Sequence, residues 1–390
     1  MVRGGLDVVV LGDPSARERV ESAGARFLDM FEGRPLAPID RTSFPNPVRW
    51  VTYTARYADE LIEQLRSLDA QVVALDGHAM MGRLAAQALG LPHVIVCAGH
   101  NIHPDDVVPM LAAEPRVRAS DECWQAAERL REEYGLADAS PFCWVPPPSP
   151  YLNIVSEPRQ FFSAAERERF EPVSFFGSLS EEDIAPPATQ SGEATYFPPD
   201  ARLRVYVSLG MSGWNAARAL MGEGPIRALH AIAEGIAALP GAHGLLALGG
   251  GTIDDELRRE LEGPRFRVET RVEQLQVLAE TDAFVTHHGI HSTHEAVARR
   301  VPMLSYPLWW DQPGLAQRCQ ELGLALPLVE EPLGLVDPDR VQQALLQVEA
   351  ERERLAGGLS VAREWEERVI AERPQTVELI AELAGVESAR

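Results

Sequence analysis

The residues best suited to chemistry lie in one short stretch, Thr286–Ala296, which reads THHGIHSTHEA. It follows the apolar run Ala283–Thr286, so we expect a strand, a glycine-containing turn and a helix opened by Ser292 and Thr293. The first amides of a helix are free and lie at the positive end of its dipole, which makes a helix N-terminus an anion site. We therefore expect His287 to donate to one phosphate oxygen while the Ser292 and Thr293 amides hold another.

Two further groups of side chains suit a sugar ligand. Glu295 comes one turn into the predicted helix and can accept hydrogen bonds from sugar hydroxyls. Pro307–Gln312 reads PLWWDQ after the next strand, which places a carboxylate and an amide beside two indoles. Sugars offer hydroxyls to such polar groups and flat C–H faces to tryptophan.

These motifs need a scaffold that ends strands at one edge of a sheet. Short β-branched runs alternate with amphipathic stretches along the chain, which is typical of parallel sheets flanked by helices. The predicted strands are Asp7–Leu11, Gln71–Leu75, His93–Cys97, Leu152–Val155 and Val173–Phe176 in a first sheet, and Leu203–Ser208, Gly244–Leu248, Ala283–Thr286 and Met303–Tyr306 in a second. The predicted helices include Ala58–Ser67, Gly82–Leu89, Pro225–Ala238, Ser292–Arg299 and Pro313–Leu322.

The two sets of strands predict two Rossmann-like domains with parallel sheets that face a cleft. Gly177–Asp200 is rich in Pro, Ser, Gly and Thr, which favours an extended connector. We expect an N-terminal domain at 1–178, a linker at 179–200, a C-terminal domain at 201–365 and a C-terminal helix at 366–390 that packs back on the body.

Composition excludes several classes of function. The 390 residues hold 58 acidic and 36 basic side chains, a net charge of −22 that repels a nucleic-acid backbone. Every basic residue is Arg, so neither a Schiff-base lysine nor a phosphate-loop lysine exists. No apolar run is long enough to span a membrane, the four cysteines have no zinc-like spacing, and the N-terminus has no signal-peptide pattern. We expect a soluble, cytoplasmic protein.

The spacing of these motifs resembles a known signature. Inverting, nucleotide-sugar-dependent glycosyltransferases of the GT-B fold, the natural-product and UDP-glycosyltransferase-like family, carry V-P-Q, T-H-G-G-x-N-S-T-x-E-A, G-V-P-M and P-x-W-x-D-Q in this order. This chain is similar, with VEQ at 272–274, HHGIHSTHEA at 287–296, RVPM at 300–303 and PLWWDQ at 307–312. Ser208-Leu209-Gly210 also resembles the family's S-L-G phosphate turn. The likeness is close after residue 200 and weaker before it.

The resemblance implies an α/β fold of the GT-B type and a donor site in the C-terminal domain. It places His287 on the diphosphate, Glu295 on the ribose, and Asp311 and Gln312 on the transferred sugar, with Trp309 packed against it. The implied donor-binding residues are Ser208, Gly210, Ser212, Arg271, Val272, Gln274, His287, Gly289, His291, Ser292, Thr293, Glu295, Trp309, Asp311 and Gln312.

Several positions depart from the family pattern. Arg271 stands where the family has a tryptophan that stacks on the base, a role that a guanidinium can also fill. His288 replaces a Gly and His291 replaces the Asn, while Ser212 is a substitute for the hydroxyl usually found at Met211.

The largest departure concerns the general base. Gly4–Phe27 resembles the family's second strand and helix, so the first strand and the histidine that deprotonates the acceptor have no counterpart here. Either the recorded start is an internal Met, or this base has been lost. Asp76 matches the acidic partner of that histidine, and His78, two residues on, is the first candidate for a replacement, with His100 and His103 as weaker ones.

The expected activity is transfer of a sugar, with inversion, from a nucleoside-diphosphate donor to a hydroxyl of a hydrophobic natural product. No metal or other cofactor is expected, because His287 and the helix N-terminus stabilise the leaving diphosphate. The expected partners are the nucleotide sugar and a small acceptor, with a homodimer or an auxiliary protein possible.

Other interpretations of the same residues remain open. The chain can instead be a degenerate relative that binds a nucleotide or stabilises a partner protein. His287, His288, His291 and His294 can suggest a metal site. Trp309 and Trp310 can be packing residues, and Glu295 can be a carboxylate that stabilises the first helical turn.

Overall fold

The computed structural model divides the chain into two compact units. It describes residues 1–35, 48–76, 79–113, 117–141, 145, 147–185, 196–210, 224–249 and 255–386. The N-terminal unit holds 1–156, 162–176 and 372–390, and the C-terminal unit holds 157–161 and 177–371. The chain therefore passes between the units four times, in contrast to the single passage near residue 178 that the sequence predicts.

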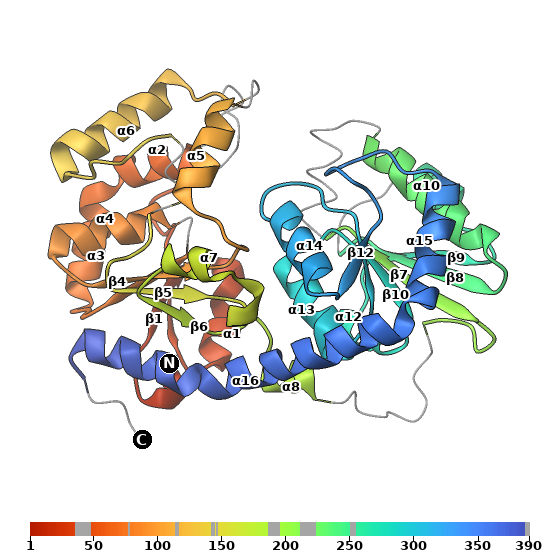
Figure 1. The fold of residues 1–390 in the computed structure, drawn as a ribbon. Helices are drawn as coiled ribbons and strands as arrows, with labels where there is room; N and C mark the ends of the chain where they lie inside the picture. Colours follow the sequence, from red (N-terminus) through yellow and green to blue (C-terminus); the bar gives the residue numbers. More distant parts are fainter. Residues whose placement is uncertain are drawn as a thin grey trace. The chain divides into compact units, whose positions relative to one another are not determined.

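A six-stranded parallel sheet forms the centre of the C-terminal unit (Figure 1). Its order is β12-β11-β10-β7-β8-β9. The bounds are β7 Leu203–Ser208, β8 Ala242–Ala247, β9 Phe266–Glu269, β10 Ala283–Thr286, β11 Met303–Ser305 and β12 Ala325–Pro327. Both central strands, β7 and β10, consist almost wholly of buried residues, as expected of strands covered on both faces.

Helices lie on both faces of this sheet (Figure 1). The described helices of this unit are α8 Glu181–Ile184, α10 Gly224–Ala238, α11 Asp255–Leu261, α12 Gln274–Ala279, α13 Ile290–Arg299, α14 Gln312–Glu321, α15 Pro338–Ala350 and the first part of α16 Arg352–Ala384. Gly235 of α10 lets α15 come close, since a Cβ there would lie 2.6 Å from the Cβ of Val341. Leucine, isoleucine and valine side chains from the strands, α10 and α15 fill one continuous core.

The N-terminal unit contains two parallel sheets rather than one. β1 (Val9–Gly12) pairs with β2 (Arg26–Asp29), and a separate sheet has the order β3-β4-β5-β6. These four strands are β3 Val73–Asp76, β4 His93–Cys97, β5 Leu152–Val155 and β6 Val173–Phe175. The prediction that Asp7–Leu11 joins the same sheet is therefore wrong. In the described residues β1 and β3 each have a single strand neighbour.

The helices of this unit are α1 Arg17–Ser22, α2 Val48–Arg56, α3 Ala58–Ser67, α4 Met80–Leu89, α5 Pro104–Ala113, α6 Asp121–Tyr134 and α7 Ala164–Glu168, with short 3-10 turns at Val2–Gly4, Pro14–Ala16 and Arg159–Phe161, the last labelled η3 and part of the C-terminal unit. Buried residues of α2, α3, α4 and α6 form one core cluster.

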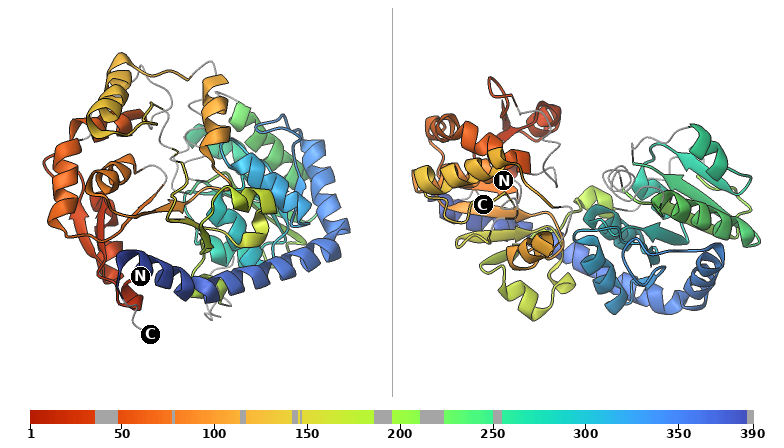
Figure 2. Two further views of the ribbon diagram at one scale, coloured as in Figure 1. Left: turned by 60° about the vertical axis from the view of Figure 1, so that its left-hand side comes forward. Right: turned by 90° about the horizontal axis from the view of Figure 1, so that it is seen from above.

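The last helix, α16, belongs to both units, with its residues up to Ala371 in the C-terminal unit and the rest in the N-terminal unit. It begins at Arg352, earlier than the 366 predicted. Figures 1 and 2 show the N-terminus beside the end of this helix, where Gly4 closely approaches Val377.

Two local predictions are corrected. The connector Gly177–Asp200 contains the short helix α8, which Ser180 begins with a reciprocal capping box to Asp183. Residues 186–195 of the connector lie outside the described residues. The helix after β10 starts at Ile290, two residues before the predicted Ser292.

Candidate donor site

Adjacent parallel strands bring the turn at Ser208-Leu209-Gly210 and His287 to one edge of the sheet. β7 and β10 pair so that Ser208 lies opposite Thr286. The residues that follow each strand therefore meet at the same carboxyl edge, where open α/β sheets bind ligands. Ser208 is buried, and Ser212 lies outside the described residues.

The imidazole of His287 is held between two glycines. A Cβ at Gly210 or at Gly289 would lie 2.5 Å from its Nε2 atom, so only glycine permits this approach at either position. Gly210 also has a φ of +72°, which glycine adopts without strain. The Nδ1 atom of His287 lies 3.3 Å from the carbonyl oxygen of Ser208. Burial lowers the pKa of His287 to about 4, so the free imidazole is neutral at pH 7.

His288, in contrast, is a structural residue. It is fully buried at a φ of +60°, the conformation that suits the Gly of the family pattern. Its Nε2 and Nδ1 atoms lie 2.8 Å from the Ser305 hydroxyl and 3.3 Å from the Thr293 hydroxyl. Burial, followed by the neighbouring His287, lowers its pKa to about 3.

The start of α13 changes which amides can meet an anion. Gly289 is its N-cap, and the amide of Thr293 donates to the carbonyl of Gly289 over 3.0 Å. The prediction that the Thr293 amide holds a phosphate oxygen is therefore wrong, since this amide is used inside the helix. The amides of the first turn belong to Ile290, His291 and Ser292.

A hydrogen-bonded group links α12 to α13. The side-chain amide of Gln274 donates to the carboxylate of Glu295 and, over 3.1 Å, to the Ser292 hydroxyl. Its carbonyl oxygen accepts from the buried Tyr206 hydroxyl at 3.0 Å, which fixes the orientation of the amide. Burial raises the pKa of Glu295, and the hydrogen bond from Gln274 opposes that shift. Tyr206 is a contributor that the sequence motifs did not reveal, since it lies inside β7 and only the strand register brings it beside α12.

The loop before α12 and the first turn of α13 carry more of the implied residues. Arg271 is exposed and Val272 is half-buried. His291 is exposed on the first turn of α13.

The PLWWDQ segment is partly structural. The carbonyl oxygen of the Gln312 side chain accepts from the backbone amides of Leu308 and Trp309, over 3.0 and 3.4 Å. Trp309 is half-buried and packs against the core of the C-terminal unit. Asp311 is the half-buried N-cap residue of α14.

Only part of the predicted acceptor chemistry lies in the described residues. Asp76 ends β3 and is exposed, whereas His78 lies outside them. His100 packs against Phe162 and His103 against Phe170, with ring centroids 5.1 and 5.7 Å apart. Both imidazoles are buried, which favours a structural role for them.

The four histidines of the HHGIHSTH stretch do not converge on one point. His287 contacts Ser208, His288 contacts Ser305, and His294 lies between Glu157 and Glu366. Among the described residues, no group of three His, Cys, Asp or Glu side chains is placed to hold a metal ion.

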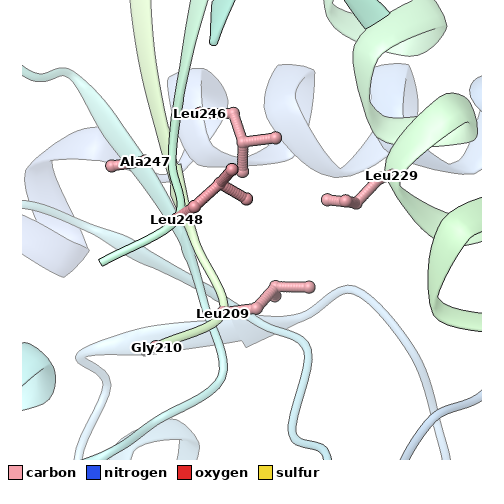
Figure 3. A pocket seen from close by; sticks show the side chains of 6 residues that line it. All are labelled: Leu209, Gly210, Leu229, Leu246, Ala247 and Leu248. Atoms are coloured by element: carbon pink, nitrogen blue, oxygen red, sulfur yellow. The ribbon is translucent and has the colours of Figure 1, made fainter. Parts of the chain in front are cut away.

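A small pocket adjoins Leu209 and Gly210 at the ends of β7 and β8 (Figure 3). Its lining consists of Leu209, Gly210, Leu229, Leu246, Ala247 and Leu248. These side chains offer neither a charge nor a hydrogen-bonding group, so the pocket does not suit a polar ligand.

Comparisons with known proteins find similarity to glycosyltransferases. Residues 230–348 match the family described as UDP-glucoronosyl and UDP-glucosyl transferase. NDP-glycosyltransferase YjiC of Bacillus subtilis is 33% identical over 124 residues, which cover 32% of this chain and 31% of that protein. Zeaxanthin glucosyltransferase of Pantoea ananas is 24% identical over 355 residues, or 84% of this chain and 79% of the relative.

Solved structures share the whole fold. The glycotransferase of kitacinnamycin superposes with a TM-score of 0.71 at 23% identity, over 98% of this chain and 93% of that one. Spinosyn rhamnosyltransferase SpnG complexed with thymidine diphosphate superposes with a TM-score of 0.61 at 19% identity, over 97% and 93%. These matches confirm the predicted α/β fold of the GT-B type and the resemblance to nucleotide-sugar-dependent glycosyltransferases. Within the described residues, no helix is both long and apolar enough to cross a membrane.

Proposed function

We propose that the chain is a nucleotide-sugar-dependent glycosyltransferase of the GT-B fold, and that it transfers the sugar, with inversion, to a hydroxyl of a hydrophobic natural product. Several relatives point to such acceptors by name, among them zeaxanthin glucosyltransferase and oleandomycin glycosyltransferase. The comparisons give no support to the alternative of a degenerate, non-catalytic relative.

The observation that carries the donor assignment is the position of His287 between Gly210 and Gly289, beside the first turn of α13. This turn offers the amides of Ile290, His291 and Ser292 to a diphosphate. The buried imidazole is neutral, and an approaching diphosphate favours its charged form, which then donates from both nitrogens. His287 thus stabilises the negative charge that develops on the leaving nucleotide.

Glu295 and Gln274 are assigned to the nucleoside. A carboxylate that already accepts from Gln274 retains acceptor positions for ribose hydroxyls. Arg271 is exposed before α12 and offers a planar guanidinium to the base. Asp311 and Gln312 are assigned to the transferred sugar, although the carbonyl oxygen of Gln312 is already engaged by the backbone.

We propose further that donor binding needs no divalent cation, because the imidazolium of His287 and the α13 amides supply positive charge at the diphosphate. For the base that deprotonates the acceptor, we assign only the carboxylate that orients it. Asp76, exposed at the end of β3, is the carboxylate that would orient it.

A cytoplasmic location is part of the same proposal. In the described part of the chain Cys97 and Cys319 are free thiols, which suits a reducing compartment. Burial raises the pKa of Cys97 to about 12, so this thiol is not reactive at neutral pH.

The proposal is tested by incubating the purified protein with UDP- and TDP-sugars and a panel of macrolide, carotenoid and phenolic acceptors, with products detected by mass spectrometry. The expected result is a glycoside of at least one acceptor, with the anomeric configuration opposite to that of the donor. If calorimetry detects nucleoside-diphosphate binding but no acceptor is glycosylated, transfer to hydrophobic acceptors is refuted while the donor site stands.

A further inference from the structure

A buried, charged cluster includes one residue of α13, the helix of the proposed donor site. His294 of α13, Glu157 and Glu366 of α16 each have a side-chain exposure of 0%. The His294 Nδ1 atom lies 2.5 Å from a carboxylate oxygen of Glu366, and its Nε2 atom lies 3.2 Å from a carboxylate oxygen of Glu157. All three residues belong to the C-terminal unit.

Three neighbours, Glu157, Glu366 and Phe161, hold the imidazole of His294. Phe161 packs edge-on against the ring, with centroids 4.8 Å apart. Burial by itself lowers the pKa of His294, but Glu366 and Glu157 outweigh it and raise the value to about 10. Both ring nitrogens are therefore protonated at pH 7, and each donates to one carboxylate.

Stability alone does not account for such a cluster. Taking charges out of water is costly, and apolar side chains of similar volume commonly stabilise a core as well or better. One Glu366 oxygen is buried without a hydrogen-bond partner, which adds to that cost. A charged trio does have one advantage over an apolar one, which is that its hydrogen bonds allow a single geometry.

The geometry that it fixes is that of α13. His294 immediately precedes Glu295 and follows Ser292 by two residues on this helix. Farther along, Arg363 of α16 donates to the carbonyl of Ala298, so α16 holds α13 at two points. Glu157 opens the short segment 157–161, which joins the C-terminal unit between two stretches of the N-terminal one.

We propose that His294 is a positioning residue of the donor site, which acts through α13 to set the place of Ser292 and Glu295 against Gln274. This inference rests on the proposed function, since it assigns a role within the same donor site. His294 has no contact with solvent, so it acts on the donor only through the helix.

The test separates position from stability. The triple variant Glu157→Met, His294→Leu, Glu366→Met removes all three charges and keeps the volume, and we expect it to fold with a Tm near or above that of the wild type. We also expect the Kd for a nucleoside diphosphate and the KM for the donor sugar to rise about 10-fold or more, because small displacements of positioning groups are costly. The KM for the acceptor should not change.

A second variant covers the case in which the triple variant does not fold. Glu366→Gln keeps the volume and one hydrogen bond but removes a charge, and its donor Kd should rise about 3-fold or more. Thr376→Val is the matched control on the same helix, because it removes a hydrogen bond from α16 to Ser174 within the N-terminal unit. Its donor Kd should equal that of the wild type.

Wild-type donor Kd in a folded triple variant, or in Glu366→Gln, would overturn the positioning role. Failure of the wild type itself to bind any nucleoside diphosphate would instead overturn the proposed function, so the two failures are distinguishable.

Discussion

The side-chain amide of Gln274 donates a hydrogen bond to the carboxylate of Glu295 and so joins the first turn of α12 to the first half of α13. Because Tyr206 donates to the same amide from β7, three elements of the sheet edge share one hydrogen-bonded group. A ligand that engages Glu295 thus meets a carboxylate whose position is already fixed, which reduces the entropy lost on binding.

Replacing Glu295 with Ala should weaken binding of a nucleoside diphosphate by about 1–3 kcal/mol, because charge-assisted hydrogen bonds to the ribose are lost. Isothermal titration calorimetry measures the change. Glu273→Ala is the matched control, because Glu273 is the exposed N-cap residue of α12 and its side chain makes no capping hydrogen bond. Equal affinities for the wild type and Glu295→Ala would refute the ribose assignment.

Binding of a donor sugar should take up protons. The pKa of His287 is lowered to about 4 by burial, and the bound diphosphate should raise it, so affinity increases as the pH falls from 8 toward 5. A nucleotide sugar is the suitable titrant, because its diphosphate has no terminal phosphate that titrates near pH 6. Calorimetry in buffers of different ionisation enthalpy measures the uptake. His287→Gln should abolish it, and uptake that persists in this variant would contradict the assignment.

Donor binding should survive removal of metal ions. Treatment with EDTA followed by gel filtration should leave the Kd for a nucleoside diphosphate within about 2-fold of its initial value, because the α13 amides and His287 supply the positive charge. Loss of binding that one divalent metal restores would show that a cation belongs to the site.

Folding stability should decline on both sides of neutral pH. For His294, whose pKa rises from 6.5 to about 10 on folding, the stabilisation is complete below pH 6.5 and is lost as the pH rises through 10. For His287 and His288, whose pKa values fall to about 4 and about 3, stabilisation is present above pH 6.5 and is lost as the pH falls through those values.

Thermal unfolding from pH 3 to pH 10 should therefore give a highest Tm near neutrality. The triple variant without the Glu157, His294 and Glu366 charges should lose the decline toward pH 10 and keep the decline toward pH 3. An unchanged alkaline decline in that variant would show that His294 does not carry the charge assigned to it.

The strands that hold the proposed donor site are predictable from the sequence, because each is marked by a short run of neighbouring residues. The runs Leu203–Ser208 and Ala283–Thr286 are mostly apolar and rich in β-branched and aromatic residues, and they coincide with β7 and β10. The start of α13 was misplaced by two residues, because Ile290 has a weak helix preference and Gly289 caps the helix without a side chain.

Such local patterns do not identify side chains that lie far apart in the sequence and contact each other in the fold. Glu157 and Glu366 lie 137 and 72 positions from His294, and no periodicity relates them. The N-terminal unit has two sheets rather than one because of which strands pair with each other. An apolar run in the sequence does not show which other strand it will pair with.

Gly289→Ala gives the sharpest test of His287. Its φ of −66° and ψ of 142° suit alanine, so the backbone is not strained. The new Cβ would lie 2.5 Å from Nε2 of His287, however, and must displace the imidazole. Donor affinity should fall about 10-fold or more, as measured by calorimetry. Gly263→Ala is the control, because nothing lies within 4 Å of its added Cβ.

A double-mutant cycle separates this displacement from a general loss of the helix cap. If Gly289→Ala acts only by moving His287, it should cost little further affinity in a His287→Ala background, because the smaller side chain leaves room for the Cβ. Equal losses of affinity in both backgrounds would mean that the glycine is needed for the α13 amides rather than for the imidazole. The diphosphate would then be held mainly by Ile290, His291 and Ser292.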